Sequence, residues 1–380
     1  MELVAGLGNA RGRDMLRIIK SGPCEFIRFS KNKDIYVFGA GRALDGCIDV
    51  YFEERNIERI IDNNEKLWGK SIKHNGKSVP ICGINEFVTD FVNKKVPIQS
   101  CILFVSSTFY AVQIVEQLDQ IKELDGVYCY VRAIGRSINE FYDDFEFSCG
   151  SQLIPKKIHY IWIGGKKLPY EYEKNIYTWK CFNPDYEIIK WDEHNYDFKK
   201  DRYTREAYDS CSWGFVPNLA RLDIVCSEGG IYLDTDVEVV SNFDKLLHDN
   251  SFFCMGSADN INQGCGFGGV KDSEIIHQMV EAFKKEIFYH DGKPEKKPCH
   301  TFIHPILKRN GFKIENRYQN INGNVIYPTE VMSPLMIDGI CDNVSGNTVS
   351  IHHSEGSWRS VIEKQEQGRI TELVSRCVSI

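Results

Sequence analysis

Two aspartates separated by one residue, Asp234 and Asp236, are the side chains whose type and spacing point most directly to chemistry. They lie in the run Gly229–Val240, where a Gly pair is followed by β-branched and aromatic residues, a pattern that predicts a strand. Strand side chains alternate between faces, so both aspartates are expected on one face with Tyr232 and Glu238. Carboxylates gathered on a buried strand repel one another and are costly to desolvate. A divalent cation offsets both effects, and Mg²⁺ and Mn²⁺ select carboxylate oxygens, so the spacing predicts a metal site.

A motif as short as D-x-D also occurs by chance, and the simplest alternative is an edge strand whose acidic face is solvated. The preceding segment, Phe215–Gly230, favours the metal site. It predicts a helix, because Pro217 suits a first helical turn and the closing glycines suit a helix end. Asn218 and Arg221 are three residues apart and are therefore neighbours on its surface. Arg221 either pairs with Asp234 or contacts a diphosphate or sugar, since its forked guanidinium serves both roles.

Two further segments are expected to reach the same site. Residues 154–165 predict a strand that ends in a glycine turn, and ligands of α/β proteins bind at such carboxyl ends. Trp162 in this segment either stacks on a nucleobase or belongs to the core, as large aromatic side chains usually do. Residues 348–353 predict another strand, and its neutral His353 or His352 is a candidate third metal ligand.

The N-terminal part of the chain carries a second pattern, β-turn-α-β, at residues 34–62. Gly39 and Gly41 follow a short apolar run, and Asp62 comes about 20 positions later, as in nucleotide-binding domains. The fingerprint is imperfect, because Leu44 stands where its third glycine is expected. The glycines therefore either approach a nucleotide or only form the tight turn of a doubly wound domain. The segment is loosely similar to the small Rossmann-like N-terminal domains of bacterial sugar-modifying enzymes.

Length and composition fit two domains, since the chain has 380 residues of which 42% are hydrophobic. An acidic, aromatic stretch at residues 139–151 precedes a new pattern, so the domains are expected at 1–150 and 151–380. The net charge of −7, without a long basic run, argues against a nucleic-acid partner. No stretch approaches the ~18 apolar residues of a membrane span, and the N-terminus does not resemble a signal peptide. The 14 cysteines are scattered without a Cys-x-x-Cys, which favours reduced thiols in a cytosolic protein.

Three blocks in this order resemble the glycosyltransferases that carry a D-x-D sugar-binding region, family 32: residues 154–165, 215–240 and 352–358. That family includes bacterial capsular and lipopolysaccharide sugar transferases and yeast mannosyltransferases, and the glucosylating clostridial toxins are more distant relatives. The resemblance covers about residues 153–360. It implies a GT-A fold, a nucleotide-sugar donor, a divalent metal and retention of the anomeric configuration.

The resemblance also implies roles for individual residues. Asp234 and Asp236 hold the metal and the donor, Arg221 lies at the phosphates or donor sugar, and Trp162 lies at the base. The remaining residues expected at the donor are Asn218, Asn262, Gln263, Ser357 and Trp358. For Trp358, a cap on the hydrophobic core is an equal alternative. Relatives commonly carry Ser-Asp where this chain has Pro217-Asn218, so a charge expected to grip donor hydroxyls is missing here.

The charges explain the expected chemistry. Cleavage of a sugar–diphosphate bond develops negative charge on the leaving diphosphate, and a cation held by two aspartates stabilises that charge. Loss of Asp234 or Asp236 is therefore expected to lower the rate by about 10²–10⁴. For the third ligand we take His353, and Mn²⁺ or Mg²⁺ is the expected cofactor. The resemblance also implies that the leaving phosphate helps to deprotonate the acceptor hydroxyl.

The sequence thus predicts an α/β protein in which a GT-A-type glycosyltransferase domain follows a small Rossmann-like domain. It is expected to transfer a hexose or N-acetylhexosamine from a nucleotide-diphosphate sugar, with UDP favoured, to a glycan or lipid-linked saccharide. The setting expected from the resemblance is cell-surface polysaccharide synthesis in the cytoplasm. Peripheral association with the inner face of the membrane and homo-oligomerisation both stay open.

Two alternatives remain from the residues. The glycine turn at 39–46 also fits an NAD-dependent sugar-nucleotide oxidoreductase, which binding of NAD but not UDP would favour. Asn218 also fits a sugar-nucleotide-binding protein without catalysis. Failure to release nucleotide from any UDP- or GDP-sugar with Mn²⁺ would favour that second alternative.

Overall fold

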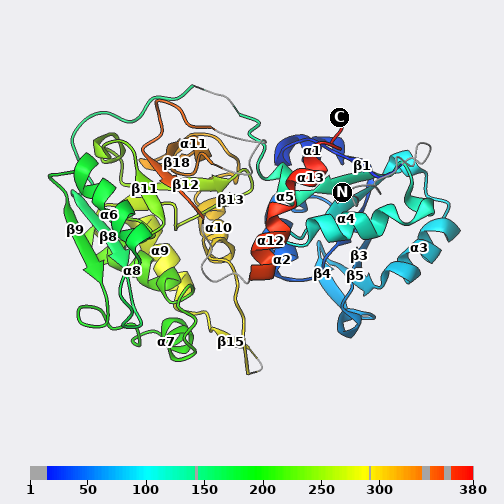
Figure 1. The fold of residues 1–380 in the computed structure, drawn as a ribbon, viewed down its shortest axis with the longest axis horizontal. Helices are drawn as coiled ribbons and strands as arrows, with labels where there is room; N and C mark the ends of the chain where they lie inside the picture. The colour runs from blue at the N-terminus through cyan, green and yellow to red at the C-terminus, as the bar shows by residue number, and fades with distance from the viewer. Residues whose placement is uncertain (1–14, 142–143, 291, 336–342, 355–360, 380) are drawn as a thin grey trace, which may run out of the picture. The chain divides into compact units, whose positions relative to one another are not determined.

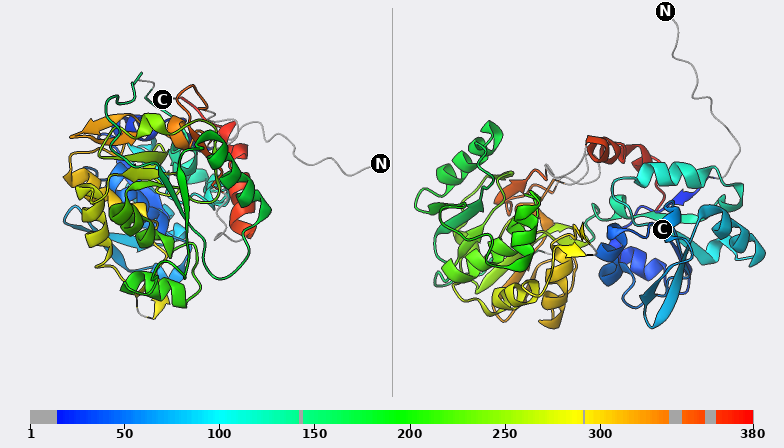
Figure 2. Two further views of the ribbon diagram at one scale, coloured as in Figure 1. Left: turned by 90° about the vertical axis from the view of Figure 1, so that its left-hand side faces the viewer. Right: turned by 90° about the horizontal axis from the view of Figure 1, so that it is seen from below.

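The computed structural model describes residues 15–141, 144–290, 292–335, 343–354 and 361–379, and its course is shown in Figures 1 and 2. These residues form two compact units. Unit 1 comprises residues 15–21, 25–135 and 361–379, and unit 2 comprises residues 22–24 and 136–354, each without the gaps named above. The division departs from the expected 1–150 and 151–380, because residues 136–150 belong to unit 2 and the C-terminal segment belongs to unit 1.

Specific contacts explain both departures. In the acidic, aromatic stretch, Phe145 stacks on Tyr318 of unit 2 with ring centroids 5.1 Å apart. At the C-terminus, Arg369 Nη2 lies 2.6 Å from Glu116 Oε1 of unit 1. The Val378 N–H also donates to the backbone of unit 1, at Ile18 O. The chain therefore returns to its first unit after completing the second.

Unit 1 is built on a sheet with the strand order β1-β7-β6-β2-β3-β5-β4. Its strands are β1 (Arg17–Ile18), β2 (Asp34–Phe38), β3 (Arg59–Ile61), β4 (Ser71–His74), β5 (Lys77–Cys82), β6 (Cys101–Val105) and β7 (Tyr128–Val131). Neighbouring strands run parallel except for the β4–β5 pair. The short apolar run predicted before Gly39 forms β2 in the middle of this sheet, beside β6, which is buried along its whole length.

Helices and an aromatic core complete unit 1. The helices are α1 (Pro23–Phe29), α2 (Arg42–Tyr51), α3 (Ile84–Asn93), α4 (Ala111–Asp119), α5 (Arg132–Gly135), α12 (Val361–Gly368) and α13 (Thr371–Val374). Short 3₁₀ turns lie at Glu65–Leu67, Ile98–Ser100 and Lys122–Leu124. Figure 1 shows α12, in red, beside α4. Phe104 and Tyr130 stack at the centre of the core, 5.3 Å between ring centroids.

Unit 2 is built on a mixed sheet with the strand order β17-β18-β12-β14-β10-β8-β9, and β13 pairs with β12. Its strands are β8 (Lys157–Ile161), β9 (Glu187–Trp191), β10 (Gly230–Tyr232), β12 (Ser251–Ser257), β13 (Asn260–Ile261), β14 (Phe267–Gly269), β17 (Gln319–Ile321) and β18 (Asn324–Tyr327). The β9, β8 and β10 strands run parallel, and β14 is antiparallel to β10 and β12. Two small ladders pair β11 (Val237–Val239) with β19 (Ser350–His352) and β15 (Tyr289–His290) with β16 (Lys293–Pro294).

The helices of unit 2 cover this sheet. They are α6 (Tyr170–Phe182), α7 (Arg202–Asp209), α8 (Pro217–Glu228), α9 (Glu274–Phe283), α10 (His300–Arg309) and α11 (Thr329–Met332), with a 3₁₀ turn at Asp244–Leu246. The views in Figures 1 and 2 show α8, α9 and α10 packed side by side. The α8 helix confirms the prediction for Phe215–Gly230, since Pro217 opens it and Gly229 follows it with a φ of 66°.

The strand predicted over Gly229–Val240 is interrupted at the D-x-D motif. β10 ends at Tyr232, and β11 begins at Val237. Between them, the Val237 N–H donates to Asp234 O at 3.2 Å, which closes a turn. The break has a physical reason, because β10 pairs within the main sheet whereas β11 pairs with β19. The two aspartates therefore lie on a turn between two ladders and not on one face of a strand.

Two features bear on the expected setting of the protein. Within the part of the chain that the structure describes, no helix combines the length and apolarity needed to cross a bilayer. The described cysteines are free thiols, and more than half of them are buried.

Candidate active site

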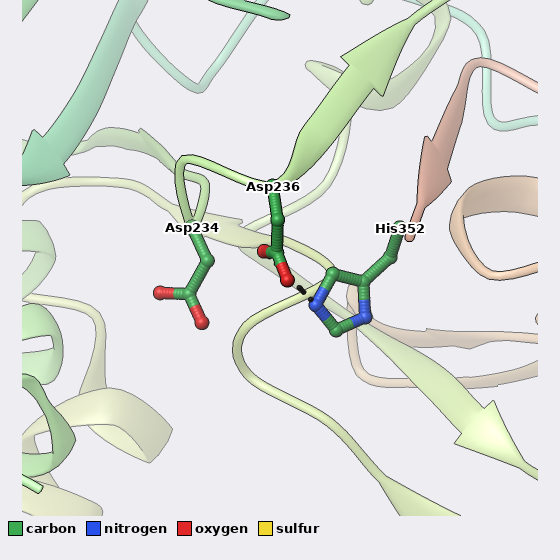
Figure 3. A group of neighbouring side chains, drawn as sticks. All are labelled: Asp234, Asp236 and His352. Carbon is green, nitrogen blue, oxygen red and sulfur yellow. Dashed lines mark ion pairs between the residues drawn. The ribbon is translucent and has the colours of Figure 1, made fainter. Parts of the chain in front are cut away.

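Three side chains converge at the turn between β10 and β11. Asp234 and Asp236 come from the turn itself, and His352 comes from β19 (Figure 3). One carboxylate oxygen of each aspartate and one imidazole nitrogen lie within 4.8 Å of one another. His352 Nε2 is 3.3 Å from Asp236 Oδ1. Carboxylates and imidazole are metal ligands, so this cluster has the donor atoms to hold a cation.

The pairing of β11 with β19 decides which histidine joins the cluster. His352 lies opposite Val237 in the antiparallel ladder, and the His353 N–H donates to Asp236 O. Because neighbouring strand residues face opposite ways, His353 points away and its Nε2 lies 3.1 Å from Glu238 Oε2. The structure thus places His352, and not the expected His353, beside the aspartates. It also turns Glu238 away from the face on which it was expected.

Asp234 is held in place from two sides. Its Oδ1 accepts a hydrogen bond from the Tyr232 hydroxyl at 2.9 Å and lies 3.5 Å from Arg221 Nη1. Its backbone N–H donates to Gly264 O at 3.1 Å. A Cβ atom on Gly264 would lie inside van der Waals contact with Asp234 Oδ2. Glycine at position 264 therefore makes room for the carboxylate.

Arg221 lies buried on α8 beneath this carboxylate, with 4% of its surface exposed. Its Nε donates to Pro217 O at 3.1 Å, and its guanidinium lies 5.0 Å from the centroid of the Tyr232 ring. Burial opposes the charged form, but the neighbouring Asp234 carboxylate raises the pKa of Arg221 above its usual range. The site therefore contains a fixed positive charge that offsets the aspartates.

His352 is buried, and its environment favours a charged ring. Burial lowers its pKa, but the Asp236 carboxylate outweighs burial, so the pKa of His352 is raised. Its other nitrogen, Nδ1, lies 3.4 Å from Asn262 Nδ2 and 3.1 Å from Ser354 Oγ. The Asn262 amide nitrogen can only donate, so Nδ1 is the acceptor in that contact. Asn262 is itself held, because its Oδ1 accepts the Gly264 N–H at 2.9 Å.

Trp162 follows β8 and leaves the sheet at the same edge as the aspartates. β8 and β10 are parallel, with His159 opposite Tyr232, so the residues that follow each strand emerge together. The Trp162 indole is partly exposed, and its Nε1 donates to Lys166 O at 2.6 Å. Its ring lies edge-on to Tyr172 with 5.8 Å between centroids. Trp162 is thus a loop residue at the site's edge and not a core residue.

Other residues expected at the donor have different surroundings. Asn218 is buried, and its Nδ2 lies 3.4 Å from the Tyr203 hydroxyl on α7. Gln263 is fully buried, and within the described ranges neither atom of its side-chain amide has a hydrogen-bond partner. Ser357 and Trp358 lie outside the described residues.

Sequence reasoning did not assign roles to several residues that shape the site. Tyr232 had a signal, because it is two residues before Asp234 and was expected on the same face. Gly264 lies in the glycine-rich run after Asn262, which the resemblance places near the donor, but its contact with Asp234 had no signal. Trp213 had no signal, since its contacts are made across the fold. The Trp213 ring lies 3.2 Å from the position of a Cβ on Gly164, and Glu193 Oε1 accepts the Gly164 N–H at 2.7 Å. Trp213 and Glu193 together fix the glycine turn that follows Trp162.

Known proteins share this region of the chain. Residues 169–253 match the family model described as a glycosyltransferase sugar-binding region containing the DXD motif. Subversion of eukaryotic traffic protein A of Legionella pneumophila is 26% identical over 174 residues, which cover 37% of this chain and 26% of that protein. Inositol phosphoceramide mannosyltransferase 3 of Schizosaccharomyces pombe is 29% identical over 158 residues, which cover 40% of this chain and 44% of that protein. The chain thus spans less than half the length of these curated relatives.

Two solved structures are also similar. The PaToxG glycosyltransferase matches 41% of this chain and 70% of its own, with 19% identity and a TM-score of 0.33. A glycosyltransferase involved in the glycosylation of the major capsid of PBCV-1 matches 56% of this chain and 98% of its own, with 12% identity and a TM-score of 0.31. Residues 169–253 thus carry the D-x-D sugar-binding region that glycosyltransferases share, and one of the curated relatives is named a mannosyltransferase. The resemblance to family 32 is thereby confirmed.

Proposed function

We propose that this protein is a metal-dependent, retaining glycosyltransferase of the GT-A type that uses a UDP-sugar. The observation that carries the proposal is the convergence of Asp234, Asp236 and His352 within 4.8 Å beside the buried Arg221. These four charged or titratable side chains lie together at the carboxyl end of β10, which is where α/β proteins bind ligands.

The donor set supports a divalent cation. Asp234, Asp236 and His352 would hold it, and Gly264 leaves the space that the Asp234 carboxylate occupies. Mg²⁺ takes oxygen ligands, so the imidazole nitrogen favours Mn²⁺ of the two expected ions. When bound, the cation supplies Lewis-acid stabilisation of the charge that develops on a leaving diphosphate.

The chain's own residues prepare the site for a negatively charged substrate. Arg221 is buried and anchored through Pro217 O, so its charge is already in place before a diphosphate arrives. Tyr232 orients Asp234, and the β19 pairing orients His352. Trp162 stands at the same edge, where its indole face would stack on a base.

The remaining parts of the proposal rest on the resemblance to family 32. They are transfer of a hexose or N-acetylhexosamine, retention, a glycan or lipid-linked saccharide as acceptor, and a role in cell-surface polysaccharide synthesis. A cytoplasmic location at the inner face of the membrane fits that acceptor. Unit 1 then serves as a Rossmann-like accessory, for docking or for nucleotide binding, and a homo-oligomer stays open.

A nucleotide-sugar panel tests the proposal directly. UDP-glucose, UDP-galactose, their N-acetyl forms and GDP-mannose are each incubated with the protein and Mn²⁺, and released nucleotide is measured. GDP-mannose is included because one relative is named a mannosyltransferase. We expect one donor to raise the thermal unfolding temperature only with Mn²⁺ and to be hydrolysed slowly, because ligands that bind the folded state stabilise it. Release that is equal in the Asp236→Asn variant would contradict the proposal.

The oxidoreductase alternative loses support from the geometry of the glycine turn in unit 1. The acid expected to bind a ribose, Asp62, accepts backbone N–H groups at both carboxylate oxygens. Ala40 N–H donates to Oδ2 and Asn64 N–H donates to Oδ1, each at 2.7 Å. A cofactor would have to displace these bonds. Equilibrium dialysis against NAD and UDP separates the alternatives, and we expect UDP alone to bind.

A further inference from the structure

Unit 2 contains a cavity of about 390 Å³ that the donor site does not use. The volume falls within the usual range of ligand pockets, about 300–1,000 Å³. Aromatic rings line one part of it and side-chain amides and hydroxyls line another. The residues that the argument uses are Phe141, Phe145, Asn316, Arg317, Tyr318 and Asn343.

The aromatic part of the lining presents flat, half-buried rings. Phe145 and Tyr318 stack with their ring planes 6° apart. The Arg317 guanidinium lies 4.9 Å from the centroid of Phe141, which spreads a planar cation over that ring. A ring face that is not covered by a neighbouring ring or by Arg317 carries partial negative charge and attracts the weakly positive C–H groups of a sugar ring.

The polar part of the lining is the loop 343–347, which the protein holds in one shape. Glu330 accepts a hydrogen bond from Ser345 Oγ at 3.1 Å and another from Asn347 Nδ2 at 3.2 Å. The Ser345 N–H donates to Thr348 Oγ1 at 3.0 Å. A loop that is ordered before binding loses little entropy when a ligand arrives.

Asn343 offers a donor to such a ligand. Its Nδ2 is buried, and the described residues provide no hydrogen-bond partner for it. A buried donor in this state lowers stability, and a turn of the side chain toward the cavity would let a ligand hydroxyl satisfy it. Asn316, on the cavity floor, is by contrast fully engaged with Asn139 and Thr329.

The charges of the lining argue against an anionic ligand. Among the described lining residues, Arg317 is the cation, and Asp144 and Glu330 are the anions. Phosphate recognition needs clustered Lys and Arg, which this lining lacks. Its amides, hydroxyls and rings instead match the alternating hydroxyl and C–H surfaces of a saccharide.

The cavity is connected to the D-x-D site by β19. Asn347 lines the cavity and His352 belongs to the metal cluster, so the two are five residues apart along the strand and its approach, at most ~17 Å. We propose that the cavity binds a neutral oligosaccharide and is a remote subsite for the acceptor glycan. The acceptor assignment rests on the proposed function, whereas saccharide binding does not.

Gly346 provides a matched pair of variants for the test. It lines the cavity, and a Cβ built on it meets open space, so Gly346→Ala and Gly346→Trp are both compatible with the fold. Maltotetraose, mannotetraose and N-acetylchitotetraose are titrated against the full chain by saturation-transfer NMR. We expect at least one to bind, with affinity unchanged in Gly346→Ala and at least about tenfold weaker in Gly346→Trp. In Asn343→Ala, loss of one hydrogen bond should weaken binding about threefold to tenfold.

Three outcomes would overturn the proposal: no binding of any of the three tetrasaccharides, equal binding in Gly346→Trp, or loss of binding in Asp236→Asn alone. Thermal unfolding of each variant checks its fold. Donor hydrolysis without acceptor reports separately on the proposed function, and we expect Gly346→Trp to leave it unchanged. Saccharide binding without donor hydrolysis would reject the transferase mechanism and keep the cavity as a sugar site.

Discussion

The glycine turn of unit 1 and the D-x-D turn of unit 2 share the same local design. Each follows a buried parallel strand, and each brings carboxylates to the carboxyl end of a sheet. In unit 1, backbone N–H groups bind both oxygens of Asp62. In unit 2, side chains surround the carboxylates, namely Tyr232 and Arg221 at Asp234 and His352 at Asp236. An acid that binds its own backbone closes a turn, whereas acids that face one another beside a fixed cation have the arrangement of the proposed metal site.

The largest expected effect tests this comparison at the acids themselves. In Asp236→Asn or Asp234→Asn, one charged ligand is lost, so we expect donor cleavage to fall by about 10²–10⁴. Asp62→Asn, in unit 1, should leave the rate unchanged. Nucleotide release with varied Mn²⁺ measures the effect.

The fold must be checked in the same series. Asp234→Asn leaves the Arg221 charge without its carboxylate partner, which destabilises a buried group. Asp236→Asn keeps that partner, so it is the cleaner variant. If the two unit 2 variants and Asp62→Asn slow the reaction equally, the distinction between the two turns is wrong.

The second prediction compares two glycines. In Gly264→Ala, the new Cβ would press on Asp234 Oδ2 and move the carboxylate. Changes to groups that orient a metal ligand typically lower affinity or activity about 10–100-fold, and we expect that loss for Mn²⁺.

The matched variant is Gly39→Ala, which is strained by a φ of 106° and by contact with Ser106 Oγ. It should lower the stability of unit 1 by about 1–3 kcal/mol and leave Mn²⁺ affinity unchanged. Isothermal titration with Mn²⁺ and thermal unfolding read the two effects separately. A Gly264→Ala protein with normal Mn²⁺ affinity would show that Asp234 does not need its observed position.

Much of this arrangement follows from local sequence, and the rest depends on distant contacts. The apolar run of β2 and the Pro and Gly boundaries of α8 predicted those elements, because burial and backbone preference act locally. The choice of His352 over His353 depends on the β11–β19 register. No local pattern fixes that register, since it is set by pairing between segments far apart in the chain.

The same limit explains the interrupted strand and the domain boundary. Alternation predicts a continuous strand through Asp234 and Asp236, but it does not show that the strand changes partners between them. The aromatic residues of the linker, such as Phe145, fit a domain edge as well as a core. Arg369 finds its partner Glu116 only after the chain has folded back.

A third prediction sharpens the view of Asp62 as a structural acid. Asp62→Ala removes the acceptor of two backbone N–H groups, so we expect unit 1 to lose about 1–3 kcal/mol of stability. Hydrogen exchange at the Ala40 and Asn64 amides should speed up most, and donor cleavage should not change. Slow exchange at both amides in the variant would mean that other groups hold the turn. Thr89→Ala, at an exposed position of α3, serves as the control.

The smallest expected effect concerns a second histidine of unit 2, which is structural. His159 is buried, its Nε2–H donates to Gly229 O at 2.7 Å, and its Nδ1 accepts the Trp191 Nε1–H at 3.1 Å. Burial lowers the pKa of His159. These bonds fix a neutral ring beside the strand that leads into Asp234.

The sign of the pH effect follows from this lowered pKa. In the unfolded chain this histidine binds a proton below about pH 6.5, whereas in the folded protein it stays neutral to lower pH. The stability that the neutral ring contributes is therefore complete above about pH 6.5 and is lost as the pH falls. Between pH 7.5 and 5.5, wild type should lose up to about 1.4 kcal/mol more unfolding free energy than His159→Gln. Urea denaturation of both proteins measures this difference, and the exposed His194→Gln should follow wild type. Parallel losses in wild type and His159→Gln would mean that protonation of this ring is not resisted, and that the sheet beneath the D-x-D turn tolerates a charge.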